Sequence, residues 1–115
     1  MTTYRVLEYI RPDGASPYRK WFDRLDAQSA AKIATAILRM ELGNLSNVKW
    51  IGTIGEYRIH WGPGYRIYLA MDGDRLIILL GGGTKQRQQT DIEQAKLNWV
   101  DYKARKAAMK RKADR

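Results

Sequence analysis

The spacing of apolar residues changes along this 115-residue chain, and these changes constrain the fold more than any other feature. After a short alternating segment at residues 3–10, apolar residues recur at helical spacing as far as residue 42. From Val48 to Leu80 the pattern is strand-like, and beyond residue 90 the helical spacing returns. A block of strands between helical blocks is typical of an α+β domain. We therefore predict one domain with the order β-α-α-β-β-β-β-α.

In the N-terminal half, turn and capping residues mark where each element begins and ends. Residues 11–15 (RPDGA) form a turn signal, and Ser16-Pro17 is typical of an N-cap followed by proline at the first helical position. A short helix is expected over residues 18–25. Asp26 can cap a second helix, which Gly43 would end in a left-handed conformation. The apolar stripe expected on this second helix is Ile33, Ala34, Ile37, Leu38 and Leu42.

In the C-terminal half, four strands and a last helix are expected. Residues 48–51 are the first of these strands, and a turn is expected over residues 52–55. The continuous apolar run at residues 76–80 predicts a strand that is covered on both faces. Thr90 and Glu93 have the spacing of a capping box that opens the helix. Its apolar stripe would be Ile92, Ala95, Trp99 and Tyr102.

The two middle strands are predicted to form a hairpin around Gly62-Pro63-Gly64. If Trp61 and Tyr65 flank a three-residue loop, Ile59 opposes Ile67 and Tyr57 opposes Leu69 on an apolar face. In the same register His60 opposes Arg66 and Arg58 opposes Tyr68 on the other face. Residues that face each other across two strands have Cβ atoms ~5 Å apart, so these four polar side chains would lie close together.

Two arginines, a histidine and a tyrosine on one sheet face suit a phosphodiester. Arginine binds phosphate oxygens bidentately and can stabilise charge that builds up in the transition state. Histidine or tyrosine can move protons, and aromatic rings can stack on bases. The alternative is an ordinary solvated sheet face, where antiparallel sheets routinely carry such residues.

The glycine-rich segment Gly81-Gly82-Gly83-Thr84-Lys85 follows the buried strand and also has two interpretations. Its glycines allow a ligand to approach the backbone closely, and Lys85 would lie near the same end of the sheet as the polar face. Alternatively, the segment is a flexible connector between strand and helix. The spacing is not that of a P-loop.

The charge of the chain favours polyanionic partners. It has 21 Lys and Arg against 12 Asp and Glu, a formal charge of +9. From residue 101 onward there are seven bases and two acids. This basic C-terminal segment is either a solvated helix end, where cations complement the helix dipole, or a tail that contacts RNA.

The composition excludes several other kinds of site. There is no cysteine, and His60 is the single histidine, so disulfides, thiolate zinc sites and His-rich metal sites are excluded. No apolar run approaches the ~20 residues of a membrane span, and the N-terminus lacks the pattern of a signal peptide. We expect a cytoplasmic protein with no membrane partner, no metal and no cofactor.

Several segments together resemble the RelE/ParE toxin superfamily. They are Leu42-Gly43-Asn44-Leu45, Tyr57-Arg58-Ile59, the stretch from Gly62 to Tyr68, and Gly81 to Lys85 followed by Gln89 and Asp91-Ile92. Within the superfamily the sequence is most similar to the HigB-like "addiction module killer" branch of type II toxin–antitoxin systems, from about Tyr4 to Lys103. The resemblance implies a curved antiparallel sheet of four to five strands packed on two N-terminal helices, followed by a C-terminal helix.

The resemblance also implies an activity and partners. RelE and HigB toxins are metal-independent endonucleases that cleave mRNA in the ribosomal A site, where the 2′-hydroxyl of the RNA attacks the adjacent phosphate. A cognate helix-turn-helix antitoxin neutralises the toxin. ParE members poison DNA gyrase instead, so gyrase inhibition remains an alternative, as does a catalytically inactive homologue that acts as a binding partner.

By position, Arg58 and Arg66 match the strand arginines of the family, and Lys85 matches the lysine of its GGxK motif. On this basis we expect the arginines to hold the phosphate and the transition state, and Lys85 or His60 to transfer protons. The expected RNA contacts are Tyr65, Tyr68, Lys49, Arg87 and Gln89, with one of the tyrosines stacking on a base. Two features depart from the family pattern: the family does not require histidine at position 60, and the C-terminal catalytic His or Tyr of some members has no counterpart here.

Overall fold

The computed structural model describes residues 3–114. The strands and helices follow the predicted order, which confirms the α+β class. They are β1 (Arg5–Glu8), α1 (Pro17–Phe22), α2 (Ala27–Glu41), β2 (Val48–Ile51), β3 (Ile54–Ile59), β4 (Tyr65–Asp72), β5 (Leu76–Thr84), the 3₁₀ helix η1 (Lys85–Arg87) and α3 (Gln88–Ala113).

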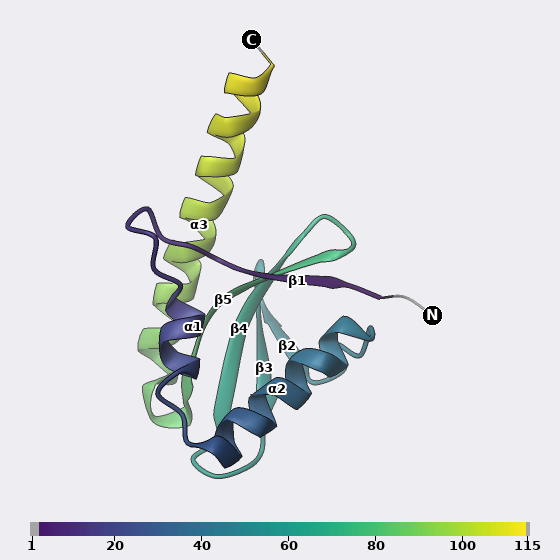
Figure 1. The fold of residues 1–115 in the computed structure, drawn as a ribbon, viewed down its shortest axis with the longest axis vertical. Helices are drawn as coiled ribbons and strands as arrows, with labels where there is room; N and C mark the ends of the chain where they lie inside the picture. The colour runs from purple at the N-terminus through teal and green to yellow at the C-terminus, as the bar shows by residue number, and fades with distance from the viewer. Residues whose placement is uncertain (1–2, 115) are drawn as a thin grey trace.

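One five-stranded sheet forms the centre of the molecule, with the strand order β1-β5-β4-β3-β2 (Figure 1). Strands β2 to β5 form an antiparallel meander, as expected. Strand β1 lies parallel to β5, with Arg5 opposite Leu76, so this N-terminal strand adds a parallel edge to the predicted antiparallel strands and the sheet is mixed. The reason is connectivity, because the chain between β1 and β5 runs through two helices and the meander rather than through a hairpin turn.

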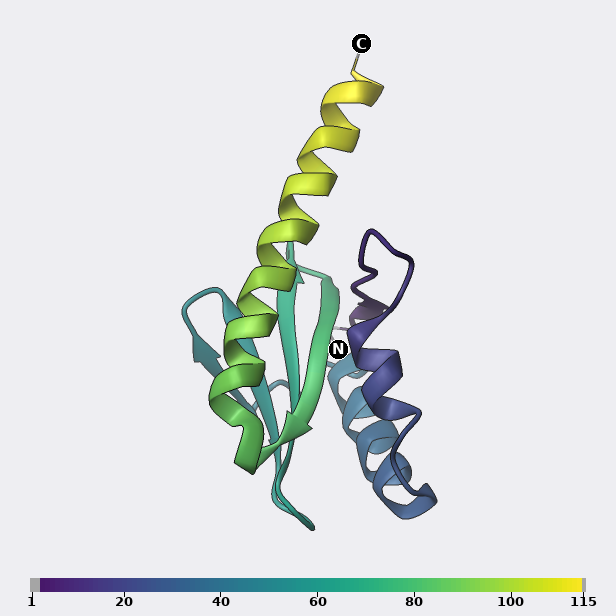
Figure 2. The same cartoon turned by 90° about the vertical axis from the view of Figure 1, so that its left-hand side faces the viewer.

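The helices cover both faces of the sheet. Helices α1 and α2 lie on one side, and α3 lies on the other and extends beyond the sheet (Figure 2). Ile33 and Met40 of α2 pack on the first face, and Trp99 of α3 packs on the second. The β5 residues 77–80 are buried between these layers, which confirms the prediction of a strand covered on both faces.

The predicted helix caps of the N-terminal half are present. The Ser16 hydroxyl accepts a hydrogen bond from the backbone N–H of Arg19 at 3.0 Å, with Pro17 at the first helical position. The Asp26 carboxylate accepts from the N–H of Ser29 at 2.7 Å, and Gly43 adopts a φ of +93° just after α2.

The predicted stripe of α2 is partly wrong. The buried residues of this helix are Ser29, Ile33, Ala36 and Met40, whereas Ala34, Leu38 and Leu42 are exposed. Apolar residues occur all around this helix, so spacing alone did not determine which of them face the sheet.

Helix α3 begins two residues before the predicted capping box. Its N-cap is Arg87, which makes no side-chain capping hydrogen bond, and Thr90 lies inside the helix. The chain passes from β5 through η1 directly into α3, so the residues just before Thr90 are already helical. Thr90 therefore cannot be the N-cap residue of this helix. The predicted apolar stripe is confirmed, since Ile92, Ala95 and Trp99 are buried and Tyr102 packs beside them.

The β3–β4 hairpin has a five-residue loop, residues 60–64, and the predicted three-residue loop is wrong. Ile59 lies opposite Tyr65, and Arg58 lies opposite Arg66. The wider loop forms because Gly64 N–H bonds to the Trp61 carbonyl while both glycines of the loop adopt positive φ. The register differs from the prediction by two residues, so every side chain keeps its predicted face.

The glycine-rich segment is part of β5 and of the core rather than a flexible connector. A Cβ atom on Gly82 would lie 2.2 Å from the Trp21 ring, and one on Gly83 would lie 2.0 Å from the Asp91 carboxylate. These two glycines therefore let α1 and α3 approach the strand closely. Within residues 3–114, no helix is long and apolar enough to cross a membrane.

Candidate nucleic-acid interface

Arg58 and Arg66, called here the arginine pair, lie directly opposite each other on β3 and β4. Both are on the sheet face that α3 partly covers. The Arg58 side chain is 33% exposed, whereas that of Arg66 is only 8% exposed. The prediction of two neighbouring arginines is confirmed, and of the two only Arg58 reaches solvent to a substantial extent.

A buried carboxylate, Glu56, lies between the two arginines and neutralises part of their charge. Its Oε1 accepts a hydrogen bond from Arg58 Nε at 2.7 Å, and its Oε2 lies 3.8 Å from Arg66 Nε. Gln88 at the start of α3 donates its amide N–H to Oε2 at 2.8 Å. Arg66 is further fixed by a 2.8 Å hydrogen bond from Nη1 to the Gly64 carbonyl. The arginine pair is therefore held in position before any ligand binds.

The environment of Glu56 keeps it ionised. Burial alone would raise its pKa, but hydrogen bonds from Arg58 and Gln88 and the charges of the two arginines outweigh burial and lower it. The nearby Tyr68 hydroxyl responds in the opposite direction, because burial and the negative charges of Glu56 and Asp91 raise its pKa.

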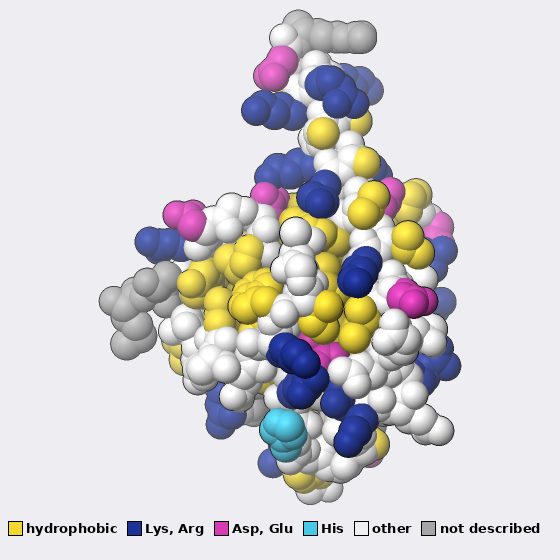
Figure 3. Space-filling view, turned by 180° about the vertical axis from the view of Figure 1, so that it is seen from behind, with side chains coloured by type: hydrophobic (Ala, Val, Ile, Leu, Met, Phe, Trp, Pro, Cys, Tyr) yellow, Lys and Arg dark blue, Asp and Glu magenta, His cyan; other side chains and the backbone are white. Residues whose placement is uncertain are grey.

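The β3–β4 loop brings two of the other predicted site residues toward the arginine pair. Lys85 is exposed, and its backbone N–H donates to the Gly64 carbonyl at 2.9 Å, so η1 begins beside the loop. His60 is exposed at the first position of the loop. Because the register differs, His60 does not lie opposite Arg66 as predicted. Lys and Arg side chains gather on this face next to the histidine, below a hydrophobic patch (Figure 3).

The predicted stacking of Tyr65 or Tyr68 on a base does not fit their burial. Tyr65 is 8% exposed, lies on the face covered by α1 and α2, and shares a 2.9 Å hydrogen bond with the Ser29 hydroxyl. Tyr68 is fully buried under α3. Alternation does not reveal this burial, because it assigns a face to each side chain but does not say what covers that face.

The three remaining predicted RNA contacts are exposed. Lys49 lies on β2 opposite Glu56 and thus on the same face as the arginine pair. Arg87 Nε is 3.9 Å from the Asp91 carboxylate, and Gln89 donates to Glu93 at 3.3 Å.

Glu56 is the main residue that the sequence prediction left out. A signal was available, because Glu56 precedes Arg58 by two residues and so shares its strand face. The partner of the Gln88 amide was not predictable from the sequence, since its contact with Glu56 depends on where α3 docks. Among residues 3–114, no cluster of three or more His, Asp or Glu side chains has a geometry suited to a metal ion.

Together, the mixed sheet between two helical layers and the arginine pair held by a buried glutamate define a small α+β domain with a basic face. The family description "Phage derived protein Gp49-like (DUF891)" matches residues 20–99, so the chain belongs to this family. The match includes the meander and the arginine pair. An uncharacterised protein of Haemophilus influenzae is 42% identical over 82 residues, which is 70% of this chain and 83% of the relative. Family membership is consistent with the RelE/HigB-like toxin resemblance of the sequence.

Proposed function

We propose that this protein is the toxin of a type II toxin–antitoxin module and acts as a metal-independent, ribosome-dependent mRNA endonuclease. The observation that carries the proposal is the arginine pair, fixed by Glu56 on a basic face of the domain. Membership of the Gp49-like family supports the toxin class.

The arginine pair suits the charge that develops during RNA cleavage. Within residues 3–114, the side-chain hydrogen bonding of Arg58 uses only Nε, which leaves its two terminal nitrogens for phosphate oxygens. A guanidinium stays charged and presents its donors in a fixed fork. Donors held in place before the reaction stabilise the transition state without reorganisation.

The proposed reaction needs one proton removed and one supplied. The 2′-hydroxyl loses its proton to a base as its oxygen bonds to phosphorus. The bond from phosphorus to the 5′ oxygen then breaks, and that oxygen takes up a proton, leaving a 2′,3′-cyclic phosphate and a 5′-hydroxyl. His60 and Lys85, both exposed beside the β3–β4 loop, are the proposed groups for these transfers. Glu56 is assigned to positioning, because its lowered pKa makes it a weak base.

Purified protein and translating ribosomes test the activity. The wild-type protein should cut mRNA in the A site, and Arg58→Ala should lower the cleavage rate by about 10²-fold or more, as expected for loss of a transition-state donor. Arg75→Ala, which removes an exposed arginine from the β4–β5 turn, is the matched control and should cleave normally. If mRNA stayed intact in the presence of the wild-type protein, the proposed nuclease activity would be rejected. DNA breaks in cells that express it would favour gyrase inhibition instead.

A helix-turn-helix antitoxin is the proposed partner, and α3 is its proposed docking element. Leu97 and Val100, one turn apart on this helix, are 64% and 60% exposed, and Met109 further along it is 73% exposed, so α3 presents apolar side chains that a partner can cover. The product of the neighbouring reading frame should co-purify with the toxin, and Val100→Asp should weaken this association. If the Val100→Asp variant co-purified with the partner as well as the wild-type protein does, the docking surface would not lie on this part of α3.

A further inference from the structure

A pocket of about 300 Å³ lies between α2 and the open edge of β3. Strand β2 pairs with β3 only as far as Tyr57, so the edge of β3 beyond this residue has no neighbouring strand. Helix α2 provides the opposite wall. The lining residues are Lys32, Thr35, Ala36, Arg39, Asn47, Tyr57, Arg58, Ile59, His60 and Trp61.

The lining of the pocket is basic and contains no carboxylate. Lys32, Arg39, Arg58 and His60 all contribute to it. Of these four, only Arg58 takes part in a salt bridge within residues 3–114. Asn47 and Tyr57 add polar groups, with the Asn47 amide 3.4 Å from the Tyr57 hydroxyl. Lys32 and Arg39, two cations that no acidic side chain pairs with among the described residues, give this concavity an attraction for an anion.

The two cations on α2 are placed by regular structure. Lys32 and Arg39 are seven residues apart and so lie on the same face of the helix. The Lys32 ammonium lies 5.5 Å from the ring centroid of Trp61, and the Trp61 ring stacks on Tyr65 at 6.3 Å. This cation–π contact holds Lys32 at the wall of the pocket.

We infer that this pocket binds a second phosphate of the RNA strand, next to the phosphate that the arginine pair receives. The inference rests on the proposed function. Arg58 belongs both to the pair and to the lining of the pocket, so a continuous strand can pass from one to the other. The pocket accommodates a group of phosphate or single-nucleotide size. It thereby extends the candidate interface around the edge of the sheet, onto the side of α2.

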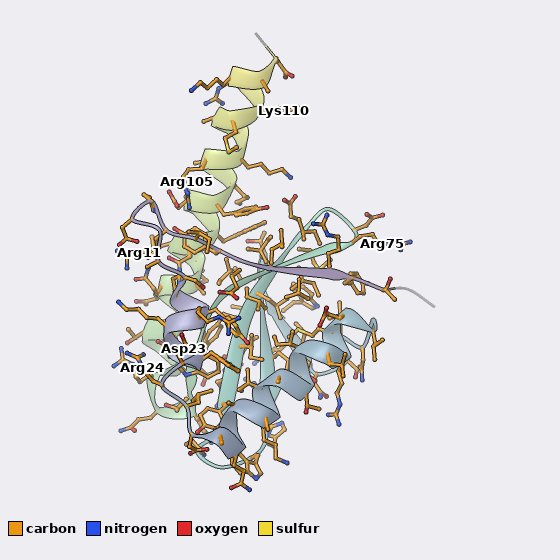
Figure 4. The ribbon with its side chains drawn as sticks, viewed as in Figure 1. Arg11, Asp23, Arg24, Arg75, Arg105 and Lys110 are labelled. Carbon is orange, nitrogen blue, oxygen red and sulfur yellow. The ribbon has the colours of Figure 1, made fainter. Side chains whose placement is uncertain are left out.

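Binding of a fluorescein-labelled single-stranded RNA oligonucleotide, measured by anisotropy over a series of salt concentrations, tests the inference. The double variant Lys32→Gln/Arg39→Gln should bind about tenfold more weakly. The slope of log K against log salt should become shallower by roughly 0.7 for each lost phosphate contact. Lys20→Gln/Arg75→Gln is the matched control, because it removes the same charge from two exposed positions outside the pocket. Figure 4 shows Arg75 at the β4–β5 turn, away from the β3–β4 loop. This control should change the affinity less than twofold.

The outcomes separate this inference from the proposed activity. Equal losses in the two double variants would mean that only net charge matters, and would overturn the inference. No saturable binding by the wild-type protein would overturn it as well. Selective loss in the pocket variant, together with intact mRNA in the ribosome assay, would support the pocket and reject the nuclease. A labelled DNA oligonucleotide of the same sequence shows whether the site requires the 2′-hydroxyl, and tighter binding of DNA would count against RNA as the ligand.

Discussion

Glu56 is the residue on which the geometry of the candidate site depends. Two guanidinium groups directly opposite each other on neighbouring strands repel, and an arginine as buried as Arg66 loses much of its hydration. A carboxylate between them offsets both costs, and it fixes Arg58 through a 2.7 Å hydrogen bond. The same carboxylate lowers the positive charge that an incoming phosphate meets. Glu56 therefore fixes the positions of the two arginines but weakens their electrostatic attraction for the proposed phosphate ligand.

Replacing Glu56 with Gln should destabilise the protein by about 3 kcal/mol, because it leaves a buried arginine without its counter-charge. The effect should depend on pH. The pKa of Glu56 is lower in the folded state than its ordinary value of 4.5, so its contribution is fully present above that value and is lost as the pH falls through the lowered pKa. Urea unfolding between pH 7 and pH 3 measures this. The exposed Glu93→Gln is the control, and equal stability of wild type and Glu56→Gln at pH 7 would contradict the assignment.

At this scale the sequence predicted which residues share a strand face, but not their burial. Alternation placed Arg58 and Arg66 on one face, and an error of two residues in the loop left that result intact. The burial of Arg66 and Tyr68 depends on the docking of α3, which no local pattern encodes.

At the scale of elements, β5 is shaped by its glycines. Gly82 receives the Trp21 ring of α1, and Gly83 receives the Asp91 carboxylate of α3. Close packing of both helices on one strand is thus possible only where side chains are missing. The glycine-rich segment was evident in the sequence, but its purpose was not. A glycine that lets a ligand approach and a glycine that lets a helix pack closely both lack a Cβ atom, so the sequence cannot distinguish them. By contrast, the caps at Ser16 and Asp26 were predictable, because their hydrogen bonds lie within three residues of the chain.

Neighbouring glycines provide a paired test of this packing. Gly82→Ala should lower the free energy of unfolding by about 1–3 kcal/mol, because the new methyl group would force Trp21 and α1 away from β5. Gly81→Ala, whose Cβ would meet nothing within 4 Å, should change stability by less than about 1 kcal/mol. Thermal unfolding of both variants measures the difference. Similar values for the two would show that α1 does not press on Gly82.

At the scale of the whole molecule, α3 is attached to the rest of the domain as far as Lys106 and is free along its last turns. Tyr102 and Lys106 bond to the Asp72 carboxylate at 2.6 Å each, and Arg105 donates to the Ile10 carbonyl. The side chains of residues 107–114 are all exposed. Figure 4 shows Arg105 beside the N-terminal segment and Lys110 on the projecting end of the helix.

Ending the chain after Lys106 should therefore leave the stability within about 0.5 kcal/mol of the full-length value, because the described residues that are lost, 107–114, are all exposed. It also removes basic residues, so binding to single-stranded RNA should weaken and depend less steeply on salt. Chemical denaturation and anisotropy measure the two effects. Unchanged RNA affinity would identify this segment as a solvated helix end, which is one of the two interpretations that its sequence allows.

The parallel pairing of β1 with β5 also bears on how the protein is made. The first strand of the chain finds its neighbour only after Leu76 has been synthesised, and Gln88, which completes the setting of Glu56, comes later still. Such distant pairings slow folding, since the intervening chain must be ordered before they form. During translation the hairpin with its two arginines can form early. Glu56 of the same hairpin becomes buried and bonded to Gln88 only after α3 has been made. The candidate site should thus acquire its finished geometry only after Gln88 has been synthesised and α3 has docked.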